Sequence, residues 1–326
     1  MRALLCRTLG DAGSLKIEEI EDPLPGPGEV VVDVHASGLN FPDTLIIAGK
    51  YQLRPELPFV PGGEAAGVIS AIGEGVGDWR EGDRVILSGA YGAFAEKAAK
   101  KAEDIIALPD SMDLTPGAGF LATYGTSYSA LKQRAQLKAG ETLLVLGAAG
   151  GVGLAAVDIG AALGARVIAA ASSDEKLDLA CRAGAVERVN YTNEDLKERV
   201  KALTDGRGAD VVYDPVGGDL SEQALRATGW DGRFLVIGFA AGTIPKIPLN
   251  LCLLKNNSIV GVFYGAWLAR DPNAHAANVA ELFALFEEGK LVPRVTQVFA
   301  LEDYIDAFAT LTGRGAMGKV IFKIRD

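Results

Sequence analysis

The chain has 326 residues, of which 49% are apolar, and it carries a net charge of −10. This length favours about two domains with a large apolar core. The negative charge argues against a general nucleic-acid binder, because nucleic-acid phosphates are met by clustered lysine and arginine.

Cysteine and histidine are scarce, which limits the possible chemistry. The three cysteines, Cys6, Cys181 and Cys252, form no CxxC pair, so neither a disulfide framework nor a structural zinc is indicated. Only His35 and His275 are present, and neither lies in a recognised pocket motif. No run of about 20 apolar residues predicts a membrane span, and the N-terminus lacks the apolar stretch of a secretion signal. We therefore expect a cytosolic protein.

The first third of the chain is rich in predicted strands. A β-branched run, "EVVVDVHASGL" at 29–39, follows the turn sequence "DPLPGPGE". Further short segments separated by glycines occupy 65–76, 83–89 and 92–100. Many short strands with glycine-rich turns indicate an all-β, barrel-like unit.

A helix closed by Gly140 is predicted over 126–140, and after it strands and helices alternate. Such alternation requires right-handed crossovers and a parallel, doubly wound sheet. The predicted strands are 141–148, 166–172, 188–191, 209–216, 232–239 and 257–265, and the helices between them are 150–165, 173–185, 193–206 and 218–229.

The last sixty residues return to a different pattern. Apolar residues Val279, Leu282, Phe283 and Phe286 mark one face of a helix that ends at Gly289. A last helix at 303–313 and a last strand at 318–324 follow. We expect this tail to rejoin the first domain, which gives an α/β protein with a β-rich domain at 1–123 and 265–326 and a Rossmann domain at 124–264.

The glycine-rich segment "GAAGGVG" is the strongest local signal for a cofactor. It follows an apolar strand, opens a helix and starts the run of βα units, which is the context that supports a dinucleotide site. Gly150 and Gly151 let the backbone approach a pyrophosphate, Gly153 lets the helix pack closely on the strand, and Val152 completes the turn. The helix N-terminus supplies free N–H groups for the phosphates.

The end of the second strand of this domain favours NADP over NAD. An NAD site places an acid there to bind the ribose 2′-hydroxyl, but here Ser172 and Ser173 occupy the position, with Lys176 within reach of a 2′-phosphate. Asp174 is the one residue that favours NAD, and its alternative role is to cap the next helix.

Over its full length the chain resembles the zinc-independent, medium-chain dehydrogenase/reductase superfamily, in its quinone oxidoreductase branch. The resemblance rests on five segments in order: "GLNFPDTLIIAGKY", "PFVPGGEAAGVISAIGEGV", "GAAGGVG", "NY" at 190–191 and "GRGAMGKVIF". It implies a GroES-like catalytic domain beside the Rossmann domain. In zinc-using relatives a ligand histidine stands where this chain has Gly63, so we expect no metal and interpret "VPGGEAAGV" as a tight turn with Glu64 in a structural role.

The resemblance also implies the roles of single residues. Asn40 matches an asparagine beside the nicotinamide and substrate, and Tyr51 matches a tyrosine that lines the substrate pocket, whereas Leu45 replaces a second pocket tyrosine. The remaining matches are to residues that contact the cofactor: Thr126, Phe239 and Phe263 at the nicotinamide, and Lys176, Tyr191 and Arg314 at the 2′-phosphate.

These features together predict an enzyme that transfers a hydride from NADPH to a quinone. Without a metal, the protein contributes positioning and hydrogen bonds, with Asn40 as a candidate for orientation and Tyr51 or water as the proton donor. The alternatives are reduction of an activated C=C bond in an enone, alkenal or enoyl thioester, and a non-catalytic NADPH-binding protein. Family analogy predicts a homodimer, paired through the strand "NSIVGVF" at a sheet edge.

Overall fold

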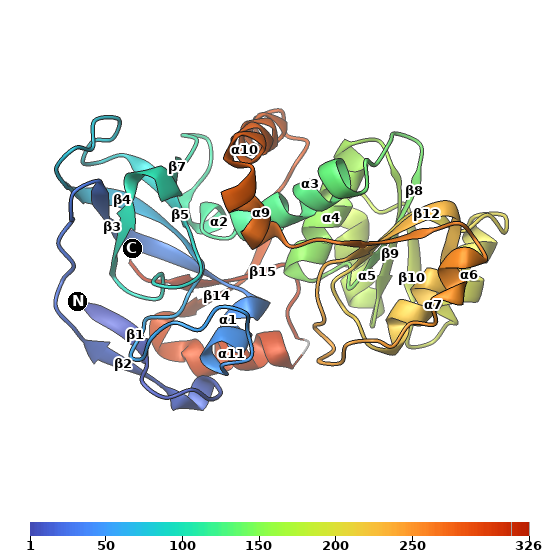
Figure 1. The fold of residues 1–326 in the computed structure, drawn as a ribbon, viewed down its shortest axis with the longest axis horizontal. Coiled ribbons are helices and arrows are strands. Elements are labelled where there is room, and N and C mark those ends of the chain that lie inside the picture. The colour runs from blue at the N-terminus through green and yellow to red at the C-terminus, as the bar shows by residue number, and fades with distance from the viewer. Residues whose placement is uncertain (314, 326) are drawn as a thin grey trace. The chain divides into compact units, whose positions relative to one another are not determined.

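A computed structural model describes residues 1–313 and 315–325 and divides the chain into two compact units (Figure 1). Unit 1 comprises Met1–Ala122 and Pro293–Asp326, and unit 2 comprises Thr123–Val292. The sequence placed the second boundary at 264/265, but the structure groups the following helices with unit 2. The reason is a set of contacts that the sequence does not reveal: Gln133 and Asn278 exchange two side-chain hydrogen bonds of 2.7 and 3.1 Å.

Unit 1 is built on a seven-stranded sheet with the order β14-β15-β3-β4-β5-β7, in which β6 also pairs with β3. The long strand β3 pairs antiparallel with β4, β6 and β15, so the C-terminal tail does rejoin the first part of the chain as expected. The elements of this unit are β1 Arg2–Cys6, β2 Leu15–Glu19, β3 Glu29–Leu39, α1 Phe41–Ile47, β4 Glu64–Ile72, β5 Arg84–Ser88, β6 Lys97–Lys101, β7 Ile105–Ala107, α2 Leu114–Gly117, β14 Val295–Ala300, α11 Tyr304–Thr312 and β15 Lys319–Lys323.

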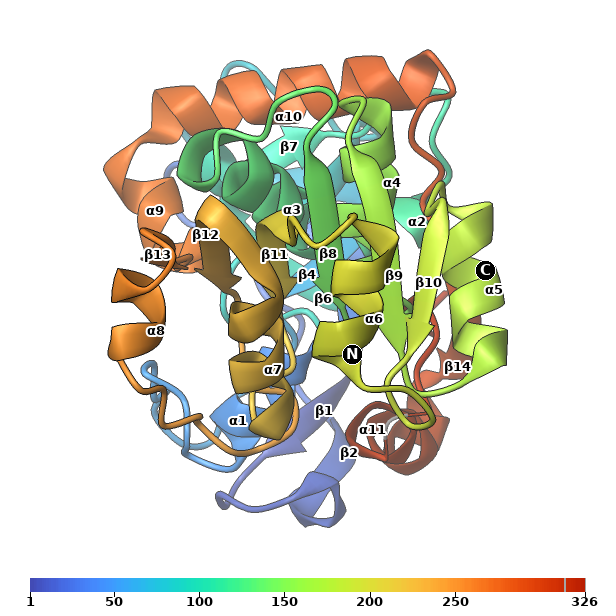
Figure 2. The same ribbon diagram turned by 90° about the vertical axis from the view of Figure 1, so that its right-hand side faces the viewer.

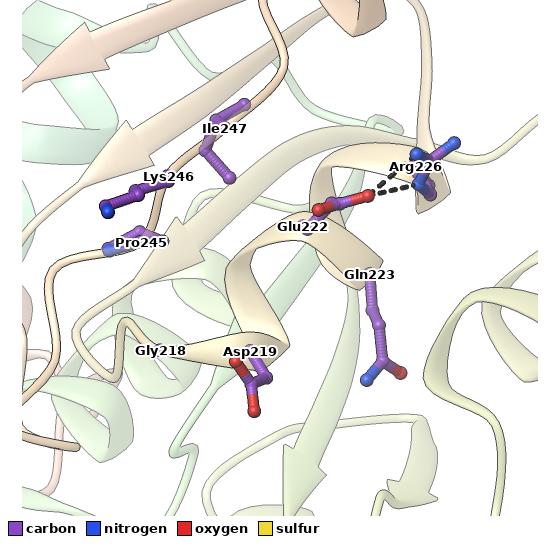
Figure 3. Close-up of a pocket in the computed structure, with 8 residues that line it drawn as sticks. All are labelled: Gly218, Asp219, Glu222, Gln223, Arg226, Pro245, Lys246 and Ile247. Atoms are coloured by element: carbon purple, nitrogen blue, oxygen red, sulfur yellow. Dashed lines mark hydrogen bonds and ion pairs between the residues drawn. The ribbon is translucent and has the colours of Figure 1, made fainter.

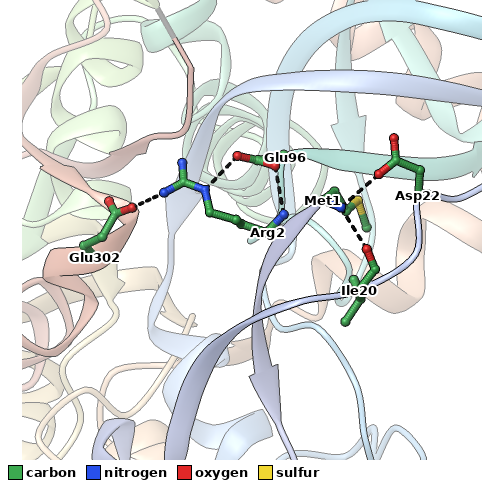
Figure 4. A network of polar contacts seen from close by, with 6 residues as sticks. All are labelled: Met1, Arg2, Ile20, Asp22, Glu96 and Glu302. Carbon is green, nitrogen blue, oxygen red and sulfur yellow. Dashed lines mark hydrogen bonds and ion pairs between the residues drawn. The ribbon is translucent and has the colours of Figure 1, made fainter.

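The pairing of β1 with β2 in a separate two-stranded sheet was not predicted. Polar contacts of Met1 and Arg2 hold this sheet in place (Figure 4). The Arg2 guanidinium pairs with the carboxylates of Glu96 and Glu302, and the Met1 amino group lies 2.9 Å from Asp22. The cation of Lys97 and the Met1 amino group lower the pKa of Asp22 to about 2. Apolar side chains of both strands, including Leu4, Cys6 and Leu15, also pack into the core of unit 1.

Unit 2 contains a six-stranded parallel sheet with the order β10-β9-β8-β11-β12-β13, whose strands β8, β9 and β10 lie side by side in Figure 2. This confirms the predicted doubly wound sheet. Its core strands are short apolar runs, and β8 is buried over all five residues. The elements are α3 Thr126–Ser129, β8 Thr142–Leu146, α4 Gly151–Ala162, β9 Arg166–Ala171, α5 Asp174–Arg182, β10 Glu187–Asn190, α6 Leu196–Leu203, β11 Ala209–Asp214, α7 Asp219–Ala227, β12 Thr228–Val236, α8 Asn250–Leu253, β13 Ser258–Gly261, α9 Tyr264–Arg270 and α10 Pro272–Glu287.

The helix expected over 126–140 is shorter and less regular than predicted. Wider π-helical turns flank α3 at Leu121–Gly125 and Ala130–Arg134, and the helix ends there rather than at Gly140. Gly140 instead adopts a positive φ of 84° in the turn before β8. No helix within residues 1–313 and 315–325 is long and apolar enough to cross a bilayer.

Candidate functional site

The glycine-rich turn between β8 and α4 has the geometry expected from its sequence. The chain leaves β8 at Leu146, and α4 begins at Gly151. A Cβ at Gly153 would lie 2.2 Å from the carbonyl oxygen of Gly147, so only glycine permits this approach of helix and strand. At the N-cap, Gly150, no side chain of the described residues caps the helix. The first-turn N–H groups are therefore available to an anionic ligand.

A buried hydrogen-bond network fixes Thr126 beside this turn. The next residue, Ser127, donates its hydroxyl to the carbonyl oxygen of Val152 at 2.9 Å. The same hydroxyl lies 2.9 Å from the Tyr213 hydroxyl, whose complete burial raises the pKa of that tyrosine. The start of α3 is thereby tied to the start of α4. Thr126, the neighbour of Ser127, therefore lies close to Val152 in the glycine-rich turn.

Two of the residues predicted to bind a 2′-phosphate, Ser172 and Lys176, meet at the end of β9. The Lys176 ammonium lies 3.3 Å from the Ser172 hydroxyl. The sequence suggested Asp174 as the helix cap, but the cap is Ser173, whose hydroxyl accepts a hydrogen bond from the Lys176 N–H. The Asp174 carboxylate instead accepts a 3.0 Å hydrogen bond from the side chain of Asn190 on β10.

The parallel sheet brings the remaining cofactor candidates of unit 2 to one edge. Tyr191 directly follows β10 and donates its N–H to Ala171 at 3.2 Å. Phe239 follows β12, and its ring packs against Gly217, where a Cβ would meet it at 2.9 Å. Phe263 follows β13 and is 56% exposed. Because all six strands run in the same direction, these residues share the carboxyl edge with Gly150 and Ser172. Arg314 lies outside the described residues.

In unit 1, Asn40 belongs to a buried polar cluster with Asp43, Glu64 and Lys319. Asn40 is the N-cap of α1, and its backbone N–H donates to the Asp43 carboxylate at 2.7 Å. The Asn40 side chain donates to the carbonyl of Gly38 at 3.3 Å and to Glu64 at 2.9 Å. The Lys319 ammonium donates to both Asn40 and Glu64 at 2.5 Å. Asn40 therefore lies in a fixed environment rather than on a mobile turn.

Tyr51, the other predicted catalytic residue, lies near this cluster. Burial and the charge of Asp43 both raise the pKa of the Tyr51 hydroxyl, so the phenol is neutral near pH 7. Burial also raises the pKa of Asp43 to about 7, although the N–H of Asn40 and the Lys319 cation partly oppose this rise. Tyr51 can therefore act as a hydrogen-bond donor, and Asp43 titrates near neutral pH.

Sequence reasoning gave a functional role to Asn40 alone and missed the other three members of the cluster, Asp43, Glu64 and Lys319. Glu64 was expected to have a structural role after loss of a neighbouring metal ligand, and Lys319 received no role at all. Only the structure shows how closely Lys319 is enclosed, because a Cβ at Gly38 or Gly119 would lie within 2.8 Å of its side chain. No local pattern pairs residues 255 positions apart.

The predicted tight turn covers only the first four residues of "VPGGEAAGV", at 60–63, because Glu64 and the residues after it belong to strand β4. Gly62 has a positive φ of 98°, and a Cβ there would collide with the Phe94 ring at 2.5 Å. The backbone of Gly63 accepts a hydrogen bond of 2.9 Å from Gly89. These contacts face the rest of the sheet, so the turn serves packing in unit 1. Within the described part of the chain, no three His, Cys, Asp or Glu side chains gather in a way that could hold a metal ion.

Both histidines are partly buried rather than fully exposed. His275 on α10 is half-buried, and its ring meets the rings of Tyr264 and Trp267 edge-on. Burial lowers the pKa of His275, so the imidazole is neutral at pH 7. His35 in β3 is also partly buried.

A separate surface pocket of about 200 Å³ lies between α7 and the segment 245–247 (Figure 3). Its polar lining is of mixed charge, and Glu222 forms an ion pair with Arg226 at 2.7 Å. None of the residues predicted from the sequence to bind cofactor or substrate lines it. We therefore do not assign it to the candidate site.

Comparison with known proteins agrees with this architecture. Residues 26–128 match the alcohol dehydrogenase GroES-like domain, and residues 151–284 match a family described as zinc-binding dehydrogenase. The quinone oxidoreductase-like protein 2 homolog of Nematostella vectensis is 40% identical over 99% of this chain and 89% of its own length. The quinone oxidoreductase of Pseudomonas aeruginosa is 36% identical, covering 94% of each chain.

Solved structures give the same result. The structure of Escherichia coli quinone oxidoreductase complexed with NADPH superimposes with a TM-score of 0.92 and 30% identity, covering 99% of this chain and 100% of that one. The predicted GroES-like and Rossmann folds are both confirmed. Together, fold, motifs and relatives show that the chain belongs to the quinone oxidoreductase branch of the zinc-independent medium-chain dehydrogenase/reductase superfamily.

Proposed function

We propose that this enzyme is an NADPH-dependent, metal-free reductase that transfers a hydride to a quinone. The observation that carries the proposal is the shared carboxyl edge of the unit 2 sheet, which gathers the glycine turn, the Ser172–Lys176 pair and three aromatic residues. The relatives named as quinone oxidoreductases, one of them complexed with NADPH, support the same assignment. We further propose that unit 1 is the catalytic domain and unit 2 the nucleotide-binding domain.

The residues at this edge fit NADPH. The uncapped first turn of α4 offers N–H groups to the pyrophosphate, and Gly150 leaves room because its Cβ position has only the Gly147 oxygen near it, at 3.4 Å. Lys176 and Ser172 offer a cation and a hydroxyl to the 2′-phosphate. When bound, NADPH supplies the hydride from its nicotinamide C4. The further residues assigned to the cofactor are Thr126, Gly151, Val152, Gly153, Tyr191, Phe239, Phe263 and Arg314.

The residues of the chain itself position the acceptor molecule and supply a hydrogen-bond donor or proton to it. Asn40 orients the acceptor, and the neutral hydroxyl of Tyr51 donates a hydrogen bond to the oxygen on which negative charge develops. The raised pKa of this tyrosine supports that role, because a phenol that remains protonated keeps its donor. A quinone takes its remaining proton from water.

The test follows NADPH absorbance with three acceptor conditions: a simple benzoquinone, an enone and no acceptor. Faster turnover with the quinone, judged by kcat/KM, supports the proposal. A higher kcat/KM with the enone would assign the enzyme to C=C reduction instead. Tight NADPH binding without turnover of either acceptor would leave a non-catalytic binding protein.

We also propose that the protein is a cytosolic homodimer. β13 is the last strand of the unit 2 sheet, and Ile259 on it is 39% exposed. Leu253 and Leu254 beside the strand are 81% and 65% exposed. An apolar sheet edge of this kind favours pairing with a second copy. Analytical ultracentrifugation at micromolar concentration distinguishes a dimer from a monomer.

A further inference from the structure

Lys319 carries a buried charge in unit 1. Its side chain is 7% exposed and that of its partner Glu64 is 2% exposed. The ammonium lies 2.5 Å from a Glu64 oxygen and 2.5 Å from the side-chain oxygen of Asn40. Glu64 also accepts a 3.0 Å hydrogen bond from the N–H of Ala122. The ion pair is therefore embedded in hydrogen bonds on both sides.

Glycines in the surrounding backbone leave space for the Lys319 side chain. A Cβ at Gly119 would lie 2.5 Å from Lys319 Cγ, and a Cβ at Gly38 would lie 2.8 Å from Lys319 Cε. Any side chain at either glycine would occupy the path of the lysine stem. Gly119 thus makes room for the lysine stem, whereas Gly38 makes room for the Ala118 carbonyl and the Glu64 carboxylate, 2.4 and 2.6 Å from its Cβ position, as well as for Lys319.

Stability alone is a poor explanation for such a pair. Taking two charges out of water is unfavourable, and replacing a buried ion pair by apolar residues of similar volume often leaves a protein as stable or more stable. Burial of the Lys319 charge is thus not explained by a gain in stability, and a role of the lysine in the active site is the alternative.

The hydrogen bonds of the cluster fix the Asn40 carboxamide in a single orientation. Lysine can only donate and a carboxylate can only accept, so the oxygen must face Lys319 and the nitrogen must face Glu64. The two N–H bonds of the nitrogen are used by Glu64 and by the Gly38 carbonyl. Only the second lone pair of the Asn40 oxygen remains for a ligand.

We propose that Lys319 is a positioning residue that, together with Glu64, holds the Asn40 carboxamide so that its oxygen acts as a hydrogen-bond acceptor in the active site. This inference rests on the proposed function, in which Asn40 orients the acceptor molecule. It also revises that role: Asn40 has no N–H left for a developing oxyanion, so it accepts a hydrogen bond instead. Other hydrogen-bond donors, such as the Tyr51 hydroxyl, therefore stabilise the oxyanion.

The test removes the ion pair without leaving a lone buried charge. In the double variant Lys319→Met/Glu64→Gln both charges are lost, while the new carboxamide at position 64 retains an oxygen for the N–H of Ala122. We expect native circular dichroism, an unchanged Kd for NADPH and a kcat about 10- to 100-fold lower, the range that misplacement of a reacting group produces. Lys323→Met, which removes an exposed lysine from the same strand, is the matched control and should retain full kcat.

Two further measurements separate positioning from a general structural effect. Asn40→Ala should lower kcat in the wild-type background but change it less than twofold in the double variant, because both changes remove the same interaction. Crystal structures should show one Asn40 rotamer in the wild type and several in the double variant. Independent, multiplicative losses in kcat, or a double variant with one ordered Asn40 rotamer, would overturn the inference. The rotamer measurement needs no turnover, so it decides the inference even if no quinone is reduced.

Discussion

The contact between Gly153 and the turn before it gives a quantitative prediction. In Gly153→Ala the new methyl group would lie 2.2 Å from the Gly147 oxygen and 2.9 Å from its carbonyl carbon. Both are backbone atoms, so neither a rotamer change nor a flexible side chain relieves the collision. Alanine is favoured over glycine within a helix by about 1 kcal/mol, while forcing an extra carbon into a packed site costs about 1–3 kcal/mol, sometimes more. The collision therefore outweighs the gain in helix propensity.

Gly150→Ala is the matched control in the same turn. The Gly150 backbone, with φ −76° and ψ 169°, suits alanine, and the nearest atom to the added carbon is the Gly147 oxygen at 3.4 Å. We expect this variant to fold normally. Its NADPH affinity should nevertheless fall, because the methyl group occupies the surface that the pyrophosphate approaches.

Thermal unfolding and NADPH titration distinguish the two variants. In a domain of this size each kcal/mol shifts Tm by about 2–4 °C. Because both contacts are with backbone atoms, the upper part of the overpacking range, about 2–3 kcal/mol, applies to Gly153→Ala. Subtracting the helix-propensity gain of about 1 kcal/mol leaves a net loss of about 1–2 kcal/mol, which predicts a Tm lower by roughly 2–8 °C, together with weaker NADPH binding. Gly150→Ala should lose affinity with Tm unchanged. A Gly153→Ala protein with the wild-type Tm and the wild-type Kd for NADPH would refute the reasoning.

Three other substitutions test separate parts of the site. Lys176→Ala should weaken NADPH binding by about 10- to 100-fold, the value of one charge-assisted hydrogen bond, and leave NADH binding nearly unchanged in fluorescence titrations; equal weakening of both cofactors would make Lys176 structural. Tyr51→Phe should lower kcat and kcat/KM together, by about 10²-fold with an enone and less with a quinone, at constant NADPH affinity; unaltered turnover of both acceptors would assign protonation to solvent. Asp43 has its pKa raised from 3.8 to about 7 in the folded protein. The unfolded chain therefore releases this proton first, and stability falls as pH rises from about 4 to 7, by at most about 4 kcal/mol. Asp43→Asn should flatten that slope in urea unfolding between pH 4.5 and 7.5, and an unchanged slope would show that other groups cause it.

Much of unit 2 was accessible from sequence because its structure follows from local patterns. Strands β8, β9 and β11 are buried, largely apolar runs that are each followed by a helix, and a parallel sheet then places every strand end at one edge. The grouping of Gly150, Ser172 and Phe239 at that edge therefore follows from chain order once the alternation is recognised. Single boundaries were less well predicted, as at Gly140, where π-helical turns end the helix early.

The domain boundary and the β1–β2 sheet depended on long-range contacts. Residues 265–292 follow the last strand of the sheet, and their sequence shows only an amphipathic helix. The paired amides of Gln133 and Asn278, 145 positions apart, anchor that helix to unit 2. Neither amide is conspicuous by itself, because polar residues on a helix are normally read as solvent-facing.

The sequence by itself determined the two folds and the glycine turn of the proposed cofactor site, since these follow from patterns among neighbouring residues. Only the tertiary structure decided how Asn40 is held. Strand β15 pairs antiparallel with β3, with Val320 opposite Leu39, and this register brings Lys319 to Asn40 across 279 positions. Sheet pairing between distant strands is set by the burial of whole faces rather than by any local pattern. A lysine in the segment "GRGAMGKVIF" therefore gave no sign in the sequence that it would lie buried between an asparagine and a glutamate.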